Sequence, residues 1–433
     1  MTHSPAWQPS ALQTLLLHAC LDSDPARASL RFEEWQRQLD LDHIDFGSYR
    51  LLPLLWKRIE ALGFNSRDRD RIKGVYRRTW YSNQLVLARA SVLVQSLAAR
   101  QIPAMVIKGA PLALCDYGDP GQRPMDDVDL VVPFAAAHQA VDALWEAGWV
   151  PEPTPLTGTR VAAAGAHSSW TAGPRRRELF DDAYFHARHA HGFRGPGGTG
   201  ADLHWFFSQG NFDPRLDEEV WKRAVPLVER SGATRWGNTL VPSPADHLLL
   251  LLVHGSRWNP VPPVRWVADS VILIRAAGGD LDWTQFRHSA EARGQAATAA
   301  AMLDYLHREF HCGIPAEALR HLGAVPVSAS LRRAAELSMN PPGMSAGLAE
   351  LSLLYQRYRS LRRAGGRTPA GGFPGYLRHV LGAPSLWALT RYVGQELGRR
   401  WTGGGMTGGG MTAPPASATP LSDTAIRRDD PFT

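Results

Sequence analysis

Hydrophobic and polar positions follow a helical period along both outer parts of the chain. Before residue 95, apolar side chains recur three and four positions apart, as in Leu12, Leu15, Leu16 and Ala19, which is the spacing of one helix face. The same spacing returns after residue 211, where we predict a second set of helices. These helices are expected at residues 245–254, 264–277, 283–293, 296–310, 331–338 and 348–363.

The middle of the chain has a different pattern, in which short apolar runs typical of strands alternate with short helices. Strands are predicted at residues 102–107, 128–132, 180–189 and 201–207, and helices at 109–115 and 135–147. Because no helical pattern directly follows the glycine-rich residues 192–200, we interpret them as a flexible hairpin connection rather than a phosphate-binding loop. This order of elements predicts a small sheet with a mixed or antiparallel edge.

These patterns predict an α+β protein in four parts. Residues 1–95 form a helical N-terminal region, 96–210 an α/β core, and 211–400 a helical C-terminal region. Residues 401–433 repeat Gly-Gly-Gly-Met-Thr and are rich in Pro, Ser and Thr, a composition typical of a disordered tail. Residues 151–176 are rich in Pro, Gly and Ser and are expected to form a mobile insertion in the core.

Composition narrows the classes of function. No apolar run approaches the roughly 18 residues needed to cross a bilayer, and the first residues lack the pattern of a secretory leader, so we expect a cytoplasmic protein without a membrane partner. Three widely spaced cysteines argue against a disulfide framework. The net charge of +6 suits an anionic ligand but is too modest to indicate DNA binding.

The candidate chemistry begins with two carboxylates in an apolar run. Asp127 and Asp129 are two positions apart, so on a strand they share one face. Such a pair is costly to bury without cations, although a surface turn could also contain it. Asp202, at a later predicted strand, could supply a third oxygen ligand for a divalent metal.

Cationic residues lie close to these acids in the sequence. The chain has 47 basic residues, of which only four are lysines, so each lysine stands out as a compact point charge in an arginine-rich protein. Lys108 precedes Gly109 at the predicted turn into a short helix, and Arg123 precedes the acidic strand. These three residues are candidates for binding phosphate.

The strings Val-Ile-Lys-Gly-Ala at 106–110, Tyr-Gly-Asp-Pro at 117–120 and Arg-Pro-Met-Asp-Asp-Val-Asp-Leu-Val-Val at 123–132 resemble bacterial nucleotidyltransferases of the DNA polymerase beta superfamily. The resemblance extends loosely over residues 80–290. It implies a small mixed-sheet nucleotidyltransferase core inserted between the helical regions. One motif departs from the superfamily, whose phosphate turn usually reads Gly-Ser, whereas this chain has Lys108-Gly109-Ala110.

The resemblance implies that Asp127, Asp129 and Asp202 are catalytic and hold Mg²⁺ or Mn²⁺. Lys108 and Arg123, with the Gly109 turn, would then bind the phosphates of a nucleoside triphosphate (NTP) such as ATP. The acceptor of the nucleoside monophosphate is left open among a small molecule, peptide, protein or RNA, and neither the base nor the oligomeric state is indicated. An alternative is a catalytically inactive binding or regulatory module of the same fold.

Several residues keep two interpretations. Asp126 is either a loop acid or a partner of the metal ligands, and His204 is either close to the acceptor or a packed, hydrogen-bonded histidine. Asp269 could contact the nucleotide, or it could be a buried acid that joins helices. The arginine-rich residues 357–367 form either a solvated helix face or a contact for an anionic acceptor.

Overall fold

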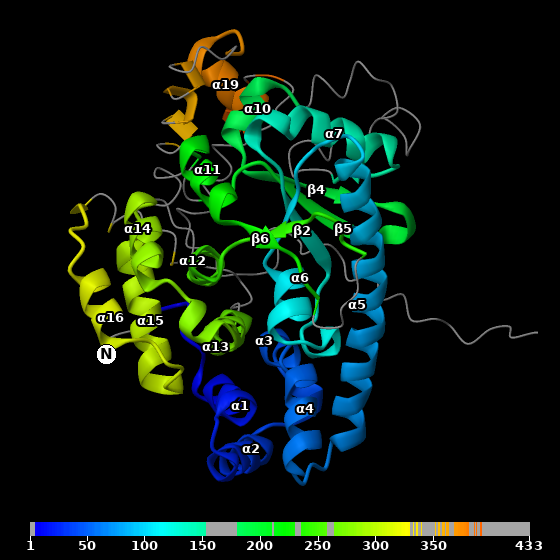
Figure 1. Cartoon of the computed structure of the whole chain (residues 1–433), viewed down its shortest axis with the longest axis vertical. Coiled ribbons are helices and arrows are strands. Elements are labelled where there is room, and N and C mark those ends of the chain that lie inside the picture. The colour runs from blue at the N-terminus through cyan, green and yellow to red at the C-terminus, as the bar shows by residue number, and fades with distance from the viewer. Residues whose placement is uncertain are drawn as a thin grey trace, which may run out of the picture.

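The computed structural model describes residues 5–152, 180–209, 212–229, 235–257 and 264–329, with some positions between 332 and 391. In these residues the protein is a mostly helical α+β fold with a seven-stranded mixed sheet in its middle (Figure 1). The predicted fold class is therefore confirmed. The insertion beyond residue 152, most of the helix predicted at 331–338, part of the helix predicted at 348–363 and the tail from residue 401 lie outside the described residues.

The N-terminal region is helical, as the apolar period predicts. Local signals set its boundaries: Ser10 and Gln13 form a capping box at the start of α1, and Gly63, with a φ of 68°, ends α4. The helices are α1 (Ala11–Leu21), α2 (Pro25–Gln38), α3 (Phe46–Tyr49), α4 (Leu52–Leu62) and α5 (Arg69–Ala98), with a 3₁₀ turn at Leu41–His43.

The C-terminal region is also helical. Its described helices are α11 (Pro214–Arg223), α12 (Pro244–Gly255), α13 (Arg265–Ala277), α14 (Trp283–Ala292), α15 (Ala296–Phe310), α16 (Ala316–Gly323) and α19 (Gly372–Val380). Of these, the sequence predicts α12, α13, α14 and α15 but not α11, α16 or α19. The apolar faces of α12, α13, α14, α15 and α16 share one core with the N-terminal helices, in which Trp7 packs edge-on against Trp266 and Tyr305. Two outer regions that are distant in sequence therefore support each other.

The sheet places the predicted acidic strands side by side. Its order is β3-β4-β5-β2-β1-β7-β6, with β2 antiparallel to β1 and parallel to β5. The strands are β1 (Met105–Ile107), β2 (Asp127–Val131), β3 (Val150–Pro151), β4 (Ala190–Arg194), β5 (Gly200–His204), β6 (Val225–Pro226) and β7 (Leu240–Val241). The last two belong to the region predicted as helical, so the sheet continues beyond residue 210.

Helices cover the sheet and connect its strands. The long helix α5 runs along one side of the molecule past the sheet (Figure 1), and it shares a core with the strands and with α7 (Ala137–Glu146). Between β1 and β2 lie α6 (Gly109–Pro111), a π-helical turn at Leu112–Asp116 and a 3₁₀ turn at Pro120–Gln122. The predicted helices at 109–115 and 135–147 are thus confirmed. No helix among the described residues is long and apolar enough to cross a membrane.

The strand predicted at residues 180–189 is wrong. These residues contain helix α10 (Asp182–Ala187) instead, and the strand that pairs with β5 begins at Ala190. The helix forms because the Asp181 side chain accepts a hydrogen bond from the Tyr184 backbone N–H, which is a helix N-cap that the apolar pattern does not reveal. The glycines after Arg194 do form the predicted hairpin connection between β4 and β5.

Helices α12 and α13 approach closely at Gly255. A Cβ atom there would lie 2.4 Å from Cβ of the buried Trp266, so alanine requires the helices to move apart. We expect Gly255→Ala to lower the free energy of unfolding by about 1 to 3 kcal/mol, measured by urea denaturation. Gly279→Ala is the matched control, because a Cβ atom there meets nothing within 4 Å. Equal stabilities of the two variants would contradict this packing.

Candidate metal and phosphate site

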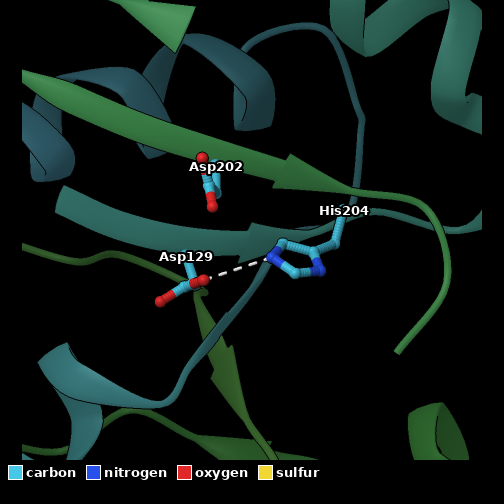
Figure 2. Close-up of side chains that lie close together, drawn as sticks. All are labelled: Asp129, Asp202 and His204. Carbon is cyan, nitrogen blue, oxygen red and sulfur yellow. Dashed lines mark hydrogen bonds and ion pairs between the residues drawn. The ribbon is translucent and has the colours of Figure 1, made fainter. Parts of the chain in front are cut away.

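Three side chains from the two central parallel strands form the candidate metal site. The register of β2 and β5 places Asp129 opposite Asp202 and Val131 opposite His204. Asp129, Asp202 and His204 each offer a ligand atom, and these atoms all lie within 4.8 Å of one another. Figure 2 shows the His204 imidazole directed at Asp129, with a distance of 3.2 Å from Nε2 to Oδ1. Two oxygens and one nitrogen form a donor set that could hold a divalent ion.

Lys108 is the cation closest to this group. It follows β1, whose Ile107 pairs with Asp129, and its Nζ atom donates to Asp129 Oδ1 at 2.5 Å. Both side chains are largely buried. The backbone of Lys108 has φ 55° and ψ −110°, a conformation that residues other than glycine rarely adopt. The turn after β1 thus places a positive charge beside the carboxylates.

The carboxylates differ in their electrostatic environment. Burial alone would raise the pKa of Asp129. The opposite effects of Lys108 and His204 are larger, so the pKa lies below its ordinary value. Burial and the charges of Asp129 and Asp202 raise the pKa of Asp127 to about 7. Burial and Asp129 likewise raise the pKa of Asp202. The site therefore carries more negative charge than Lys108 balances, which favours binding of another cation.

Asp127 lies beside the three-residue group and is not a member of it. It shares a strand face with Asp129, and its Cα position pairs with Gly200 at the start of β5. A Cβ atom at Gly200 would lie 3.1 Å from Asp127 Cβ, so the neighbouring strand leaves little space on that side. Metal binding by Asp127 stays a prediction. His204, for which the sequence left two interpretations open, is a member of the group.

Arg123 has a buried partner of its own. Its Nε and Nη2 atoms donate to the two carboxylate oxygens of Asp269, each at 2.8 Å, and both residues are buried. Burial would lower the pKa of Arg123, but Asp269 raises it above its ordinary value. Of the two interpretations of Asp269, this contact favours the buried acid that joins elements. The charge of Arg123 is already balanced by Asp269. Phosphate binding by Arg123 stays a prediction.

The loop that carries Arg123 is held by Asn83 on α5. The Asn83 side chain is fully buried, donates to the backbone oxygens of Pro120 and Arg123, and accepts from the backbone N–H of Met125. Asp126, at the end of this loop, contacts Arg50. These contacts fix the direction in which the chain enters β2, and therefore the position of the two acids on that strand.

Packing around Gly109 leaves little room for a side chain. A Cβ atom there would lie 2.7 Å from Arg123 Nη1 and 3.2 Å from Met125. The residue is buried, and the helix that follows is only three residues long. Its predicted role in binding phosphate therefore stays a prediction, and the structure gives a separate steric reason for glycine.

Two arginines near the site form no ion pair with a carboxylate among the described residues, although Asp269 and Asp126 partly offset the charges around Arg265. Arg257, after α12, contacts Gln209, and Arg265, in the first turn of α13, donates to the Pro124 backbone oxygen at 2.5 Å. Burial and neighbouring cations lower the pKa of Arg257 to about 10 and that of Arg265 to about 9. These neighbours are Arg357 for Arg257, and Arg123 and Arg50 for Arg265. An anion would relieve this excess of positive charge.

His254 lies near both the two arginines and the metal site. Its side chain is exposed near the end of α12, and its charge interacts with those of Lys108, Asp129, Arg257 and Arg265. The sequence pattern predicts no role for His254, Arg257 or Arg265. Helical periodicity gives no signal for Arg257, because α12 ends at Gly255.

A mixed sheet with carboxylates on adjacent central strands, near cations that form no ion pair with a carboxylate in the described part of the chain, defines a protein suited to bind a metal ion together with an anion. The chain belongs to a nucleotidyltransferase family: residues 47–311, more than half of its 433 residues, match the family described as "Uncharacterised nucleotidyltransferase". This match confirms the resemblance seen in the sequence. A comparison with curated proteins found no match.

Proposed function

We propose that this protein is a divalent-cation-dependent enzyme that transfers a nucleoside monophosphate from an NTP to an acceptor hydroxyl or similar group. The observation that carries the proposal is the group of Asp129, Asp202 and His204, whose ligand atoms lie within 4.8 Å of one another. Family membership supports the reaction class and an NTP substrate. Arg257 and Arg265, which form no ion pair with a carboxylate among the residues that the structure describes, support an anionic ligand near this group.

We assign the metal ligands to Asp129 and Asp202, with Asp127 or His204 completing the set. Carboxylate oxygens suit Mg²⁺ and Mn²⁺, and an imidazole nitrogen favours Mn²⁺ over Mg²⁺. A bound divalent ion would neutralise negative charge on the phosphates during transfer. The excess of negative charge on β2 and β5 supports this assignment, because burial and mutual repulsion raise the pKa values of Asp127 and Asp202.

In the proposed reaction the acceptor oxygen attacks the α-phosphorus of the NTP. The bond between the α-phosphorus and the bridging oxygen breaks, and pyrophosphate leaves. Asp202 accepts the acceptor's proton as a general base. Lys108, which contacts Asp129, binds the phosphates together with Arg257 and Arg265, whose charges act on the same His254 side chain as those of Lys108 and Asp129.

A second candidate function is an NTP-binding module without turnover. The observation that favours it is the contact between Lys108 and Asp129, because an ammonium group lies on a carboxylate oxygen needed for metal binding. The departure from Gly-Ser at this turn points in the same direction. The two functions differ in whether bound NTP is converted into labelled acceptor and pyrophosphate.

The deciding experiment incubates the protein with each of the four NTPs, labelled at the α-phosphate, in cell extract with Mg²⁺ or Mn²⁺. We expect label on an acceptor with the wild type and loss of at least about 100-fold of that label with Asp202→Asn. Asp304→Asn, which changes an exposed acid paired with Arg308 on α15, is the matched control and should keep full activity. NTP binding without any transfer would favour the binding module, and absence of both would refute the proposal.

A further inference from the structure

The Lys108 ammonium lies at the centre of the negative charge of the site. Its Nζ atom is 2.5 Å from Asp129 Oδ1, and the same oxygen is 3.2 Å from His204 Nε2. Asp127 and Asp202 attract the ammonium as well. One lysine therefore interacts with three carboxylates, among which are the two that we assign to the metal.

The position of Lys108 is fixed by the backbone on both sides. It directly follows β1, which lies between β2 and β7 in the sheet, and it directly precedes Gly109, which packs against Arg123 and Met125. The positive φ of Lys108 is one of three among the described non-glycine residues. Surrounding packing must maintain such a conformation, so the ammonium is held near the carboxylates rather than reaching them from a flexible loop.

A divalent ion bound by Asp129 would lie within a few ångströms of this ammonium. Two cations at that distance repel each other, even in a partly hydrated site. Asp129 Oδ1 also has limited capacity, since it already accepts from Lys108 and lies within hydrogen-bonding distance of His204. Cation binding by the carboxylates and the contact with Lys108 therefore oppose each other.

Building on the proposed function, we propose that Lys108 is an internal counter-ion that competes with the divalent cation for Asp129. The lysine balances the carboxylates while no cation is bound, and it weakens binding of the metal alone. When a cation binds, the displaced ammonium becomes available to the phosphates. Metal and NTP are then expected to strengthen each other's binding, because each removes an interaction that opposes the other.

The test measures the affinity for Mn²⁺ alone, without nucleotide, by electron paramagnetic resonance of the free ion. Lys108→Gln removes the charge and keeps a hydrogen-bond donor for Asp129, so we expect its Mn²⁺ affinity to be at least about tenfold higher than that of the wild type. Lys108→Arg keeps the charge and should bind Mn²⁺ as weakly as the wild type. Lys222→Gln, which removes an exposed lysine paired with Glu219, should also leave the affinity unchanged.

The outcomes separate this inference from the proposed function. Wild-type and Lys108→Gln proteins that bind Mn²⁺ equally well, or weaker binding by the variant, would overturn the competition and leave the metal site intact. If no variant binds Mn²⁺ while all unfold cooperatively, the metal site itself is refuted, and with it the proposed function. Lys108→Met provides a second neutral variant if the glutamine variant does not fold.

Discussion

Replacing Asp127 by asparagine should abolish transfer while making the protein more stable. We expect activity to fall by about 100- to 1,000-fold, because the variant loses a charge that the proposed site uses to hold its cation. The free energy of unfolding at pH 8 in a chelator should rise by about 1 to 2 kcal/mol, since the substitution relieves repulsion among buried carboxylates. Label transfer and urea denaturation measure the two effects, with Asp304→Asn as the control for both.

The stability gain should depend on pH. The pKa of Asp127 is about 7 in the folded protein against an ordinary value of 3.8, so between these values the folded state retains a proton that the unfolded state loses. Raising the pH through this window therefore destabilises the wild type at this residue. The stability difference between variant and wild type should be near zero below pH 4 and complete above pH 7. A difference that does not change with pH would show that Asp127 is not repelled.

Replacing Asp269 by asparagine should lower the free energy of unfolding by about 3 to 5 kcal/mol. The substitution leaves the buried Arg123 guanidinium without its charged partner, and uncompensated buried charges are strongly destabilising. Denaturation in urea measures the loss. Asp304→Asn breaks an exposed ion pair and should change stability by no more than about 0.5 kcal/mol. The double variant Arg123→Met with Asp269→Leu should be more stable than Asp269→Asn, because neither charge then remains.

The single variant Arg123→Met decides between two roles of Arg123. If Arg123 holds the loop before β2 against α13, Arg123→Met should have a lower free energy of unfolding than the wild type at every NTP concentration. A variant with wild-type stability and a large loss of NTP affinity would instead support the phosphate contact predicted from the sequence. The 2.8 Å contacts with Asp269 favour the first result.

Much of the fold is readable from local patterns. The helical period predicted α15 with its observed bounds, Ala296–Phe310, because an amphipathic helix shows its apolar face in the sequence. The error at residues 180–189 has a local cause as well, since a short run rich in aromatic residues fits a strand or a buried helix equally well. There the Asp181 cap decided in favour of a helix.

The candidate site is only partly readable. The alternation of side chains along a strand placed Asp127 and Asp129 on one face without knowledge of their neighbours. His254, Arg257 and Arg265 carried no comparable signal, because their relation to the site depends on the tertiary packing of α12 and α13. Arg123 is a similar case. In the sequence it lies near Asp127 and Asp129, but in the structure it pairs with Asp269.

The sequence alone determined the class of the fold, the family and the strand that carries two acids, because periodicity and short motifs act over a few neighbouring residues. Only the tertiary structure decided which charges meet. Lys108 reaches Asp129 across 21 positions, His204 reaches Asp129 across 75, and Arg123 reaches Asp269 across 146. Such pairings depend on strand register and helix packing, which arise from the whole core rather than from any local pattern.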